Sequence, residues 1–329
     1  MKWILVFFVC FSVFCQSCSP QKHLMVNSNQ SFKSALSQLN PGDTLYVKSG
    51  TYDLNLFNLI PSGANWDSPV VIKAVEGSKP IIRPKSGYRV LHFGNYYQNQ
   101  IPVHHIEIDG LILDAKNVIS DAIKITDGAH HIRIKNCEIK NSKSVGILIP
   151  HKDSDYNEII NCKVHSNGVN DFLHGIYISS DYNVVDSCEI YNNAGCGINV
   201  FNGKGTSNYN TILNCHIHNN ASVGNRGTGI NLHSGKGHVA RNNVIHDNKN
   251  GIQVKYNSVE CIVEDNLLYS HPGYSIVLGN GSTDCVARNN TIVKNFIKRH
   301  PEVLIGEKAT RPKVLSTHYK ENLSEVENF

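Results

Sequence analysis

Three side chains in neighbouring parts of this sequence have the chemistry to move a proton. His233 and Lys255 each follow a short apolar phrase, and Tyr177 lies inside another such phrase. An imidazole or an amine can act as a general base, and a phenol can return a proton to a leaving group. A base beside a cation suits removal of a proton next to a carboxylate. We therefore take His233 or Lys255 as the candidate base and Tyr177 as its acid partner.

Polar and aromatic side chains accompany these three positions. Amides take the place of Tyr177 in the following phrases, namely Asn199, Asn231 and Gln253. Amides donate hydrogen bonds to carboxylates and hydroxyls, and the ring of Phe201, in the column of His233, can stack on a sugar. These residues are candidate substrate contacts. The competing interpretation is that they only cover the outer face of a sheet.

Three further cations are candidate contacts for an anionic chain. Lys204 and Lys236 lie in equivalent glycine-rich turns, NGKG and SGKG, and Arg226 lies in a loop just before a repeat. An arginine there can bind a carboxylate with two parallel hydrogen bonds. The alternative is that the lysines are solvated residues of ordinary turns.

Two phrases that recur in order must position these side chains. The first has the form Gly-Ile-x-apolar: GILI at 146–149, GIYI at 175–178, GINV at 197–200, GINL at 229–232 and GIQV at 251–254. The second is centred on residues 23 to 28 apart: Cys137, Cys162, Cys188, Cys215, Asn243, Asn266 and Asn290. Short repeats of alternating strands cannot bury their apolar faces alone, but stacked coils can. The sequence predicts an all-β, right-handed, single-stranded parallel β-helix.

The recurring Cys and Asn residues are expected to share one corner of each coil. Asn side chains stacked there would bond one another and the turn backbone, and thiols would fill the same place in the earlier coils. Neighbours on such a ladder lie about 4.8 Å apart. We expect buried free thiols, with one disulfide between neighbours as the alternative. We expect no structural metal at these cysteines, since the eight after residue 17 contain no CxxC spacing.

Composition excludes several classes of protein. The 329 residues include 39 Asn and 25 Gly, and the formal net charge is +4. The chain is too apolar to be disordered and too weakly basic to indicate a nucleic-acid partner. Lys2 and the apolar run at 3–14 predict a signal peptide over 1–17 and hence export to the periplasm, the cell surface or the medium. Cys18 after Ser17 also fits a lipid anchor, and no segment is long enough for a transmembrane span.

Residues before the repeats carry a different pattern. Residues 31–39 predict a short amphipathic helix that caps the solenoid, and PGDTLYVKSGTY follows at 41–52. With SPVVIKA at 68–74, this opening resembles secreted pectate-lyase-like β-helix proteins, above all polysaccharide lyases of the alginate lyase and chondroitinase B type. We expect one β-helix domain over 18–295 and a tail or C-terminal cap over 296–329.

A second resemblance is local. Residues 145–172 resemble the Asp-Pro-His segment of mannuronan C5-epimerases, and His151 matches the histidine of that family. This implies substrate contact by His151. The acids and the tyrosine of the family are replaced by Ile149, Gly146 and Asn170.

Together these patterns predict an exported protein that acts on an acidic polysaccharide as a uronate lyase or C5-epimerase. A non-catalytic polysaccharide-binding surface protein is the alternative. A glycoside hydrolase needs two carboxylates across the scissile bond, and the middle repeats show none in the outward columns. We expect no cofactor; the nearest acids for a Ca²⁺ site are Asp153, Asp155 and Asp181.

Overall fold

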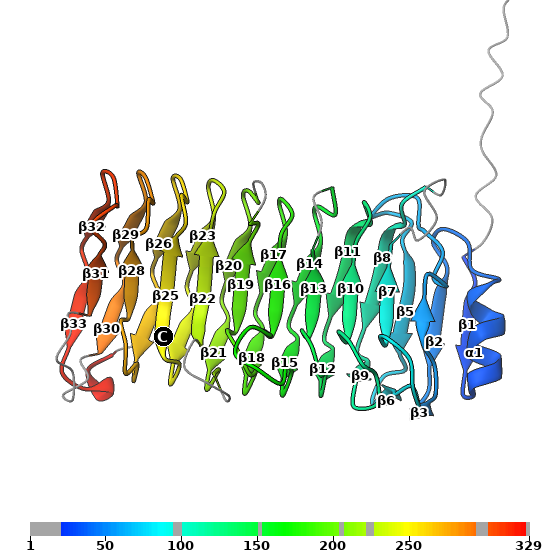
Figure 1. Cartoon of the computed structure of the whole chain (residues 1–329). Coiled ribbons are helices and arrows are strands. Elements are labelled where there is room, and N and C mark those ends of the chain that lie inside the picture. The colour runs from blue at the N-terminus through cyan, green and yellow to red at the C-terminus, as the bar shows by residue number, and fades with distance from the viewer. Residues whose placement is uncertain are drawn as a thin grey trace, which may run out of the picture.

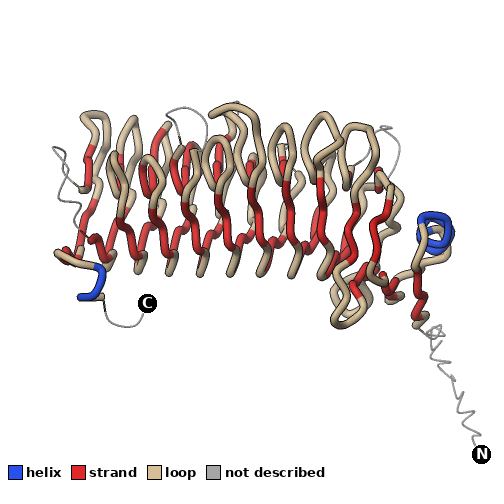
Figure 2. The backbone as a smooth tube through the Cα atoms, turned by 90° about the horizontal axis from the view of Figure 1, so that it is seen from below, coloured by secondary structure: helices blue, strands red, loops and turns tan. Residues whose placement is uncertain are grey.

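Three long parallel sheets around one apolar core make up the protein (Figure 1). The computed structural model describes residues 21–94, 101–150, 153–203, 207–221, 227–293 and 302–326. Within these residues, sheet A has 12 strands, sheet B has 11 and sheet C has 10. The chain visits the sheets in turn, so each strand pairs with the equivalent strand of the next coil. Figure 2 shows the coils as a regular spiral.

The strands are short, and their bounds follow the repeats. Sheet A consists of β1 His23–Val26, β2 Thr44–Val47, β5 Val70–Ala74, β8 His104–Asp109, β11 His130–Lys135, β14 Glu158–Ile160, β17 Val184–Asp186, β20 Thr211–Leu213, β23 Val239–Arg241, β26 Ile262–Glu264, β29 Val286–Arg288 and β32 Lys313–Leu315. Sheet B consists of β3 Gly50–Tyr52, β6 Pro80–Ile82, β9 Ile112–Asp114, β12 Glu138–Lys140, β15 Lys163–His165, β18 Glu189–Tyr191, β21 His216–His218, β24 Val244–His246, β27 Leu267–Tyr269, β30 Thr291–Val293 and β33 His318–Lys320. Sheet C consists of β4 Leu56–Phe57, β7 Leu91–Phe93, β10 Ile123–Ile125, β13 Ile147–Ile149, β16 Ile176–Ile178, β19 Ile198–Phe201, β22 Thr228–His233, β25 Asn250–Lys255, β28 Ile276–Leu278 and β31 Val303–Ile305.

The Gly-Ile-x-apolar phrase forms the strands of sheet C, as the alternation predicted. In β16, Ile176 and Ile178 are fully buried, while Tyr177 between them points outward. Each fully buried aliphatic side chain contributes about 1.5–3 kcal/mol relative to an exposed one. Stacking the coils joins these side chains into one core along the whole axis.

Buried ladders of Asn and Cys run along all three corners of the coil. The corner between sheets A and B contains Cys137, Cys162, Cys188, Cys215, Asn243, Asn266 and Asn290. The corner between B and C contains Asn167, Asn193, Asn220 and Asn248. The corner between C and A contains Asn157, Asn183, Asn210, His238, Cys261 and Cys285. The sequence pattern predicted the first ladder and missed the other two.

The Asn members satisfy the backbone where it turns. At Asn183 the backbone N–H and the side-chain amide both donate to Oδ1 of Asn210, at 2.9 and 3.0 Å. Tyr182, just before it, has φ of 56°, which turns the chain sharply. An unsatisfied buried N–H would cost about 1–3 kcal/mol. Each pair of hydrogen-bonded Asn residues therefore stabilises the contact between one coil and the next.

The cysteines are free thiols, as expected, and the alternative of a ladder disulfide is wrong. All seven described cysteines are buried and unpaired by disulfides. The backbone N–H of Cys162 approaches Sγ of Cys188 at 3.4 Å, and that of Cys215 donates to Oδ1 of Asn243 at 3.0 Å. Thiol and amide therefore take the same place on one ladder. Cys18 lies outside the described residues.

The two ends of the stack differ. At the N-terminal end of the stack lies helix α1, Asn29–Leu36 (Figures 1 and 2). Its buried residues are Phe32, Ala35 and Leu36, and the Ser28 side chain caps its first turn. At the other end, residues expected to form a tail or cap contain β31, β32, β33 and a 3₁₀-helix, Leu323–Glu325. The stack thus continues past residue 295. Among the described residues no helix has the length and apolar character to cross a membrane. The predicted signal peptide lies outside them.

His238 gives the fold a predictable acid sensitivity. Its Nδ1 accepts the Asn210 N–H at 3.2 Å, and its Nε2 lies 2.8 Å from the Ser234 carbonyl oxygen. Burial lowers its pKa from 6.5 to about 4. Because the pKa is lower in the folded state, the stabilisation that neutral His238 contributes is fully present above pH 6.5 and is lost as the pH falls through about 4.

We predict that His238→Asn keeps the ladder and removes this sensitivity. The unfolding free energy lost between neutral pH and about pH 4 should shrink by about 3 kcal/mol. Urea unfolding at the two pH values measures this. The exposed His318→Asn is the control and should leave the loss unchanged. An equal loss in both variants would contradict the role of His238.

Candidate functional site

A groove of about 420 Å³ lies on the outer face of sheet C. Its floor comes from strands β19, β22 and β25, and its walls come from the loops at the corner between sheets B and C. The lining residues are Asp171, Phe172, His174, Cys196, Asn199, Thr228, Asn231, His233, Lys249, Asn250, Gln253 and Tyr256.

The structure brings four of the predicted site residues into this groove. Asn199, Asn231 and Gln253 are directly paired across adjacent strands, and His233 lies two residues after Asn231. Although they point away from the core, Asn199, Asn231 and His233 are only 6–8% exposed. The loops therefore cover what the alternation alone would leave open, and these side chains are not solvated surface.

An amide network crosses the floor of the groove. The Asn231 Nδ2 atom donates to Oδ1 of Asn199 at 3.1 Å and approaches Sγ of Cys196 at 3.1 Å. Two other buried atoms, Oδ1 of Asn231 and Nε2 of His233, have no hydrogen-bond partner among the described residues. Buried polar atoms are nearly always satisfied, so this pair marks a place for solvent or a ligand.

Aromatic rings surround the imidazole of His233. The ring of Tyr256 meets it edge-on with centroids 4.8 Å apart, and the ring of Phe201 does so at 6.2 Å. Tyr256 is half exposed, so its ring offers a face to a bound molecule. Phe201 is half-buried and lies at the margin of the groove, beside His233 in the register.

The environment keeps His233 neutral. Burial lowers its pKa from 6.5 to about 3, and the charges of Lys255 and His174 add to the shift. A neutral imidazole has a free lone pair and can accept a proton. His233 is therefore unprotonated, with a lone pair available, across the physiological pH range.

Lys255 and Tyr177 lie beside the groove without lining it. Lys255 pairs with His233 in the register, and its Nζ donates to Oε1 of Gln253 at 2.7 Å. Burial lowers the pKa of Lys255 and raises that of Tyr177. The Tyr177 ring stacks on His174 with centroids 5.7 Å apart. Tyr177 therefore does not lie where a residue that transfers a proton directly to a bound substrate would have to lie.

His174 is the main residue that the sequence analysis missed. Its Nδ1 accepts the backbone N–H of Cys196 at 3.0 Å, so the neutral ring carries its proton on Nε2. Burial lowers its pKa to about 4, and the nearby Asp171 opposes the shift. His174 comes just before GIYI, but it belongs to a corner loop, where the alternation of strand residues does not predict which way a side chain points.

Other predicted contacts are placed elsewhere. Lys236 lies on the turn after β22, and its Nζ is 3.0 Å from Oε2 of Glu260, so an acid already neutralises it. Lys204, Arg226 and His151 lie outside the described residues.

The acids considered for Ca²⁺ serve the turns instead. Asp155 Oδ1 accepts the backbone N–H of Asp181, and Asp181 accepts two hydrogen bonds from Asn208. Neither these two nor Asp153 belongs to the cluster of candidate metal ligands found among the described residues.

Comparison with known proteins agrees with this architecture. Residues 121–297 match the family described as right handed beta helix region, and the chain belongs to this family. No curated protein matches the chain in sequence.

Solved structures share the fold. An alginate lyase from Paenibacillus sp. str. FPU-7 is 17% identical, with a TM-score of 0.64 over 88% of this chain and 99% of its own. The A-module of a mannuronan C-5 epimerase from Azotobacter vinelandii is 14% identical, with a TM-score of 0.62 over 89% and 92%. The surface adhesin PfbA of Streptococcus pneumoniae is 12% identical, with a TM-score of 0.62 over 91% and 90%. The resemblance to pectate-lyase-like β-helix proteins is thereby confirmed for the fold.

The pKa of His233 depends on its burial first and on the charge of Lys255 second. Lys255→Met should raise the pKa of His233 above about 3, because one cation is removed. The pKa should stay below 6.5, because burial is the larger cause. Histidine NMR across a pH titration measures this shift. The control is Lys236→Met, because Lys236 is already paired with Glu260, and this variant should leave the pKa of His233 unchanged. A pKa of His233 near 6.5 in the wild-type protein would contradict the role of burial.

Proposed function

We propose that this protein acts on a uronate-containing acidic polysaccharide in the groove over sheet C. The observation that carries the proposal is the pair of unpartnered buried atoms, Nε2 of His233 and Oδ1 of Asn231, in a groove lined by amides. A neutral base next to hydrogen-bond donors suits proton removal beside a carboxylate.

The proposed reaction begins at C5 of the uronate. His233 Nε2 takes the C5 proton, while Asn199, Asn231 and the Lys255–Gln253 pair hold the carboxylate and stabilise its developing charge. In elimination, the C4–O bond breaks, its electron pair leaves on oxygen, and that oxygen receives a proton. In epimerisation, a proton returns to C5 from the opposite face.

We assign the proton donor to His174 in place of Tyr177. His174 lines the groove and carries its proton on Nε2, whereas Tyr177 lies on β16, two strands from His233, or about 10 Å along the sheet. In this proposal the stacked ring of Tyr177 positions His174.

The groove suits this chemistry better than hydrolysis. Among the described residues that line it, Asp171 is the one carboxylate. A glycoside hydrolase needs two carboxyl groups, about 5 to 9.5 Å apart, on either side of the bond. Lys249 at the rim supports an anionic substrate.

A second candidate function is polysaccharide binding without catalysis. The half-exposed ring of Tyr256 at the groove, with Phe201 close by, supports it, because such rings stack on sugars. The adhesin among the similar structures has the same fold.

Incubation with alginate, pectate and glycosaminoglycans separates these functions. We expect ultraviolet absorbance from unsaturated products or, for epimerisation, altered polymer signals in NMR. His233→Asn should lower the rate by about 100-fold or more. Lys236→Met, outside the groove, should keep the wild-type rate. Binding of a polymer with no reaction on any of them would favour the non-catalytic function.

We further propose that the protein is exported and that α1 caps the N-terminal end of the core. Lys2 with the apolar run at 3–14 supports export, and the buried face of α1 supports the cap. Intact mass of the protein from its native host should show loss of residues 1–17, plus diacylglycerol if Cys18 is lipidated. A mature chain that retains Met1 to Ser17 would contradict export by this signal.

A further inference from the structure

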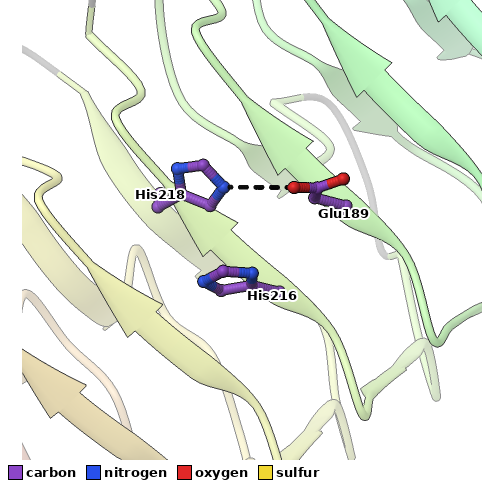
Figure 3. Close-up of side chains that lie close together, drawn as sticks. All are labelled: Glu189, His216 and His218. Carbon is purple, nitrogen blue, oxygen red and sulfur yellow. Dashed lines mark ion pairs between the residues drawn. The ribbon is translucent and has the colours of Figure 1, made fainter.

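A cluster of imidazoles and one carboxylate lies on the outer face of sheet B, away from the groove on sheet C. Glu189 comes from β18, His216 and His218 from β21, and His246 from β24 (Figure 3 shows the first three). One ligand atom from each of Glu189, His216 and His218 lies within 4.8 Å of the others. Apart from the pair His216 and His218 on one strand, the residues come from different coils, so spacing along the chain does not reveal the group.

The ring of His218 is oriented to present a lone pair. Its Nδ1 lies 2.8 Å from Oδ1 of Asn219, an acceptor, so the neutral ring carries its proton there. Its Nε2 is buried, has no hydrogen-bond partner among the described residues, and lies 3.6 Å from Oε1 of Glu189 (Figure 3). A nitrogen lone pair facing a carboxylate is stabilised when a cation lies between them, which is either a metal ion or the proton that makes the two groups an ion pair.

His246 orients His216 from the next coil and is hydrogen-bonded through both of its ring nitrogens. Nδ1 of His246 bonds Oδ2 of Asp247 at 2.7 Å, the carboxylate–histidine arrangement that orients metal-binding imidazoles. Its Nε2 lies at hydrogen-bond distance from Nε2 of His216, at 2.7 Å, so one of these two nitrogens carries a proton. Ligands around a tetrahedral ion with bonds of 2.0–2.1 Å lie about 3.3 Å apart, and one ligand atom from each of Glu189, His216 and His218 lies within 4.8 Å of the others.

Aromatic stacking holds two of the rings in place. Tyr191, His218, His246 and Tyr269 stack in succession, with centroids 4.6 to 5.2 Å apart. His216 is exposed and lies outside this stack, with its ring tilted against those of His218 and His246 at centroid distances of 4.4 and 4.9 Å. Lys163 bonds Oε2 of Glu189 at 2.8 Å and leaves Oε1 facing the histidines.

We propose that Oε1 of Glu189, Nε2 of His218 and a ring nitrogen of His216 bind a divalent transition-metal ion, with Zn²⁺ as the best match. Two imidazoles and one carboxylate suit Zn²⁺ and neighbouring metals, whereas Ca²⁺ and Mg²⁺ prefer oxygen ligands alone. The ligands come from β18 and β21, so the ion would cross-link two adjacent coils. This site is independent of the proposed function.

Calorimetric titration of the full, tag-free chain with Zn²⁺ tests the proposal. We expect one ion per chain, and Co²⁺ should give the intense visible absorption of tetrahedral coordination. His216→Asn should weaken binding by about 10-fold or more, and Glu189→Gln by a similar factor. His216 is exposed, so the variant should fold; circular dichroism checks this.

The control is the double variant His105→Asn/His131→Asn. These histidines belong to a second group on sheet A, where their rings stack 4.7 Å apart, and they would account for adventitious binding. Zn²⁺ affinity should be unchanged in this control. Absence of saturable binding up to about 100 μM, or loss of binding in the control and not in His216→Asn, would overturn the proposal.

Discussion

The hydrogen bond from the backbone of one corner to the side chain of the next coil is the interaction on which this structure depends. A parallel solenoid turns a sharp corner three times per coil, and each turn buries a backbone N–H group. The Asn ladders satisfy these groups, as between Asn193 and Asn220, and they repeat at the strand spacing. Because each Asn bonds the equivalent residue of the next coil, the ladders also fix the register of the strands.

That register builds the site. It places His233 beside Lys255 and aligns Asn199, Asn231 and Gln253 across three coils, although they are up to 54 residues apart in the chain. The groove then depends on the loops at the corner between sheets B and C. These loops add His174 and cover the amides, and the resulting burial keeps His233 neutral.

Sequence reasoning was sufficient for the parts that repeat. Period-two alternation predicted the strands of sheet C and their outward columns, and the Cys–Asn column predicted one ladder and its free thiols. It missed His174, and also His238 on a ladder of Asn. The direction of a side chain in a corner depends on the backbone turns there and not on the alternation of strand residues. The cluster around His216 was missed because its members meet only when coils stack. Burial of Asn231 could not be predicted either, since the covering loops have no periodic pattern.

We propose that the groove over sheet C holds a uronate chain with its C5 atom beside His233. A crystal structure of the His233→Asn variant with a saturated uronate oligosaccharide tests this most directly. We expect a sugar carboxylate hydrogen-bonded to Asn199 or Asn231, with C5 facing residue 233 and a sugar ring against Tyr256. An oligosaccharide bound on sheet A or B, with the groove filled by ordered water, would contradict it.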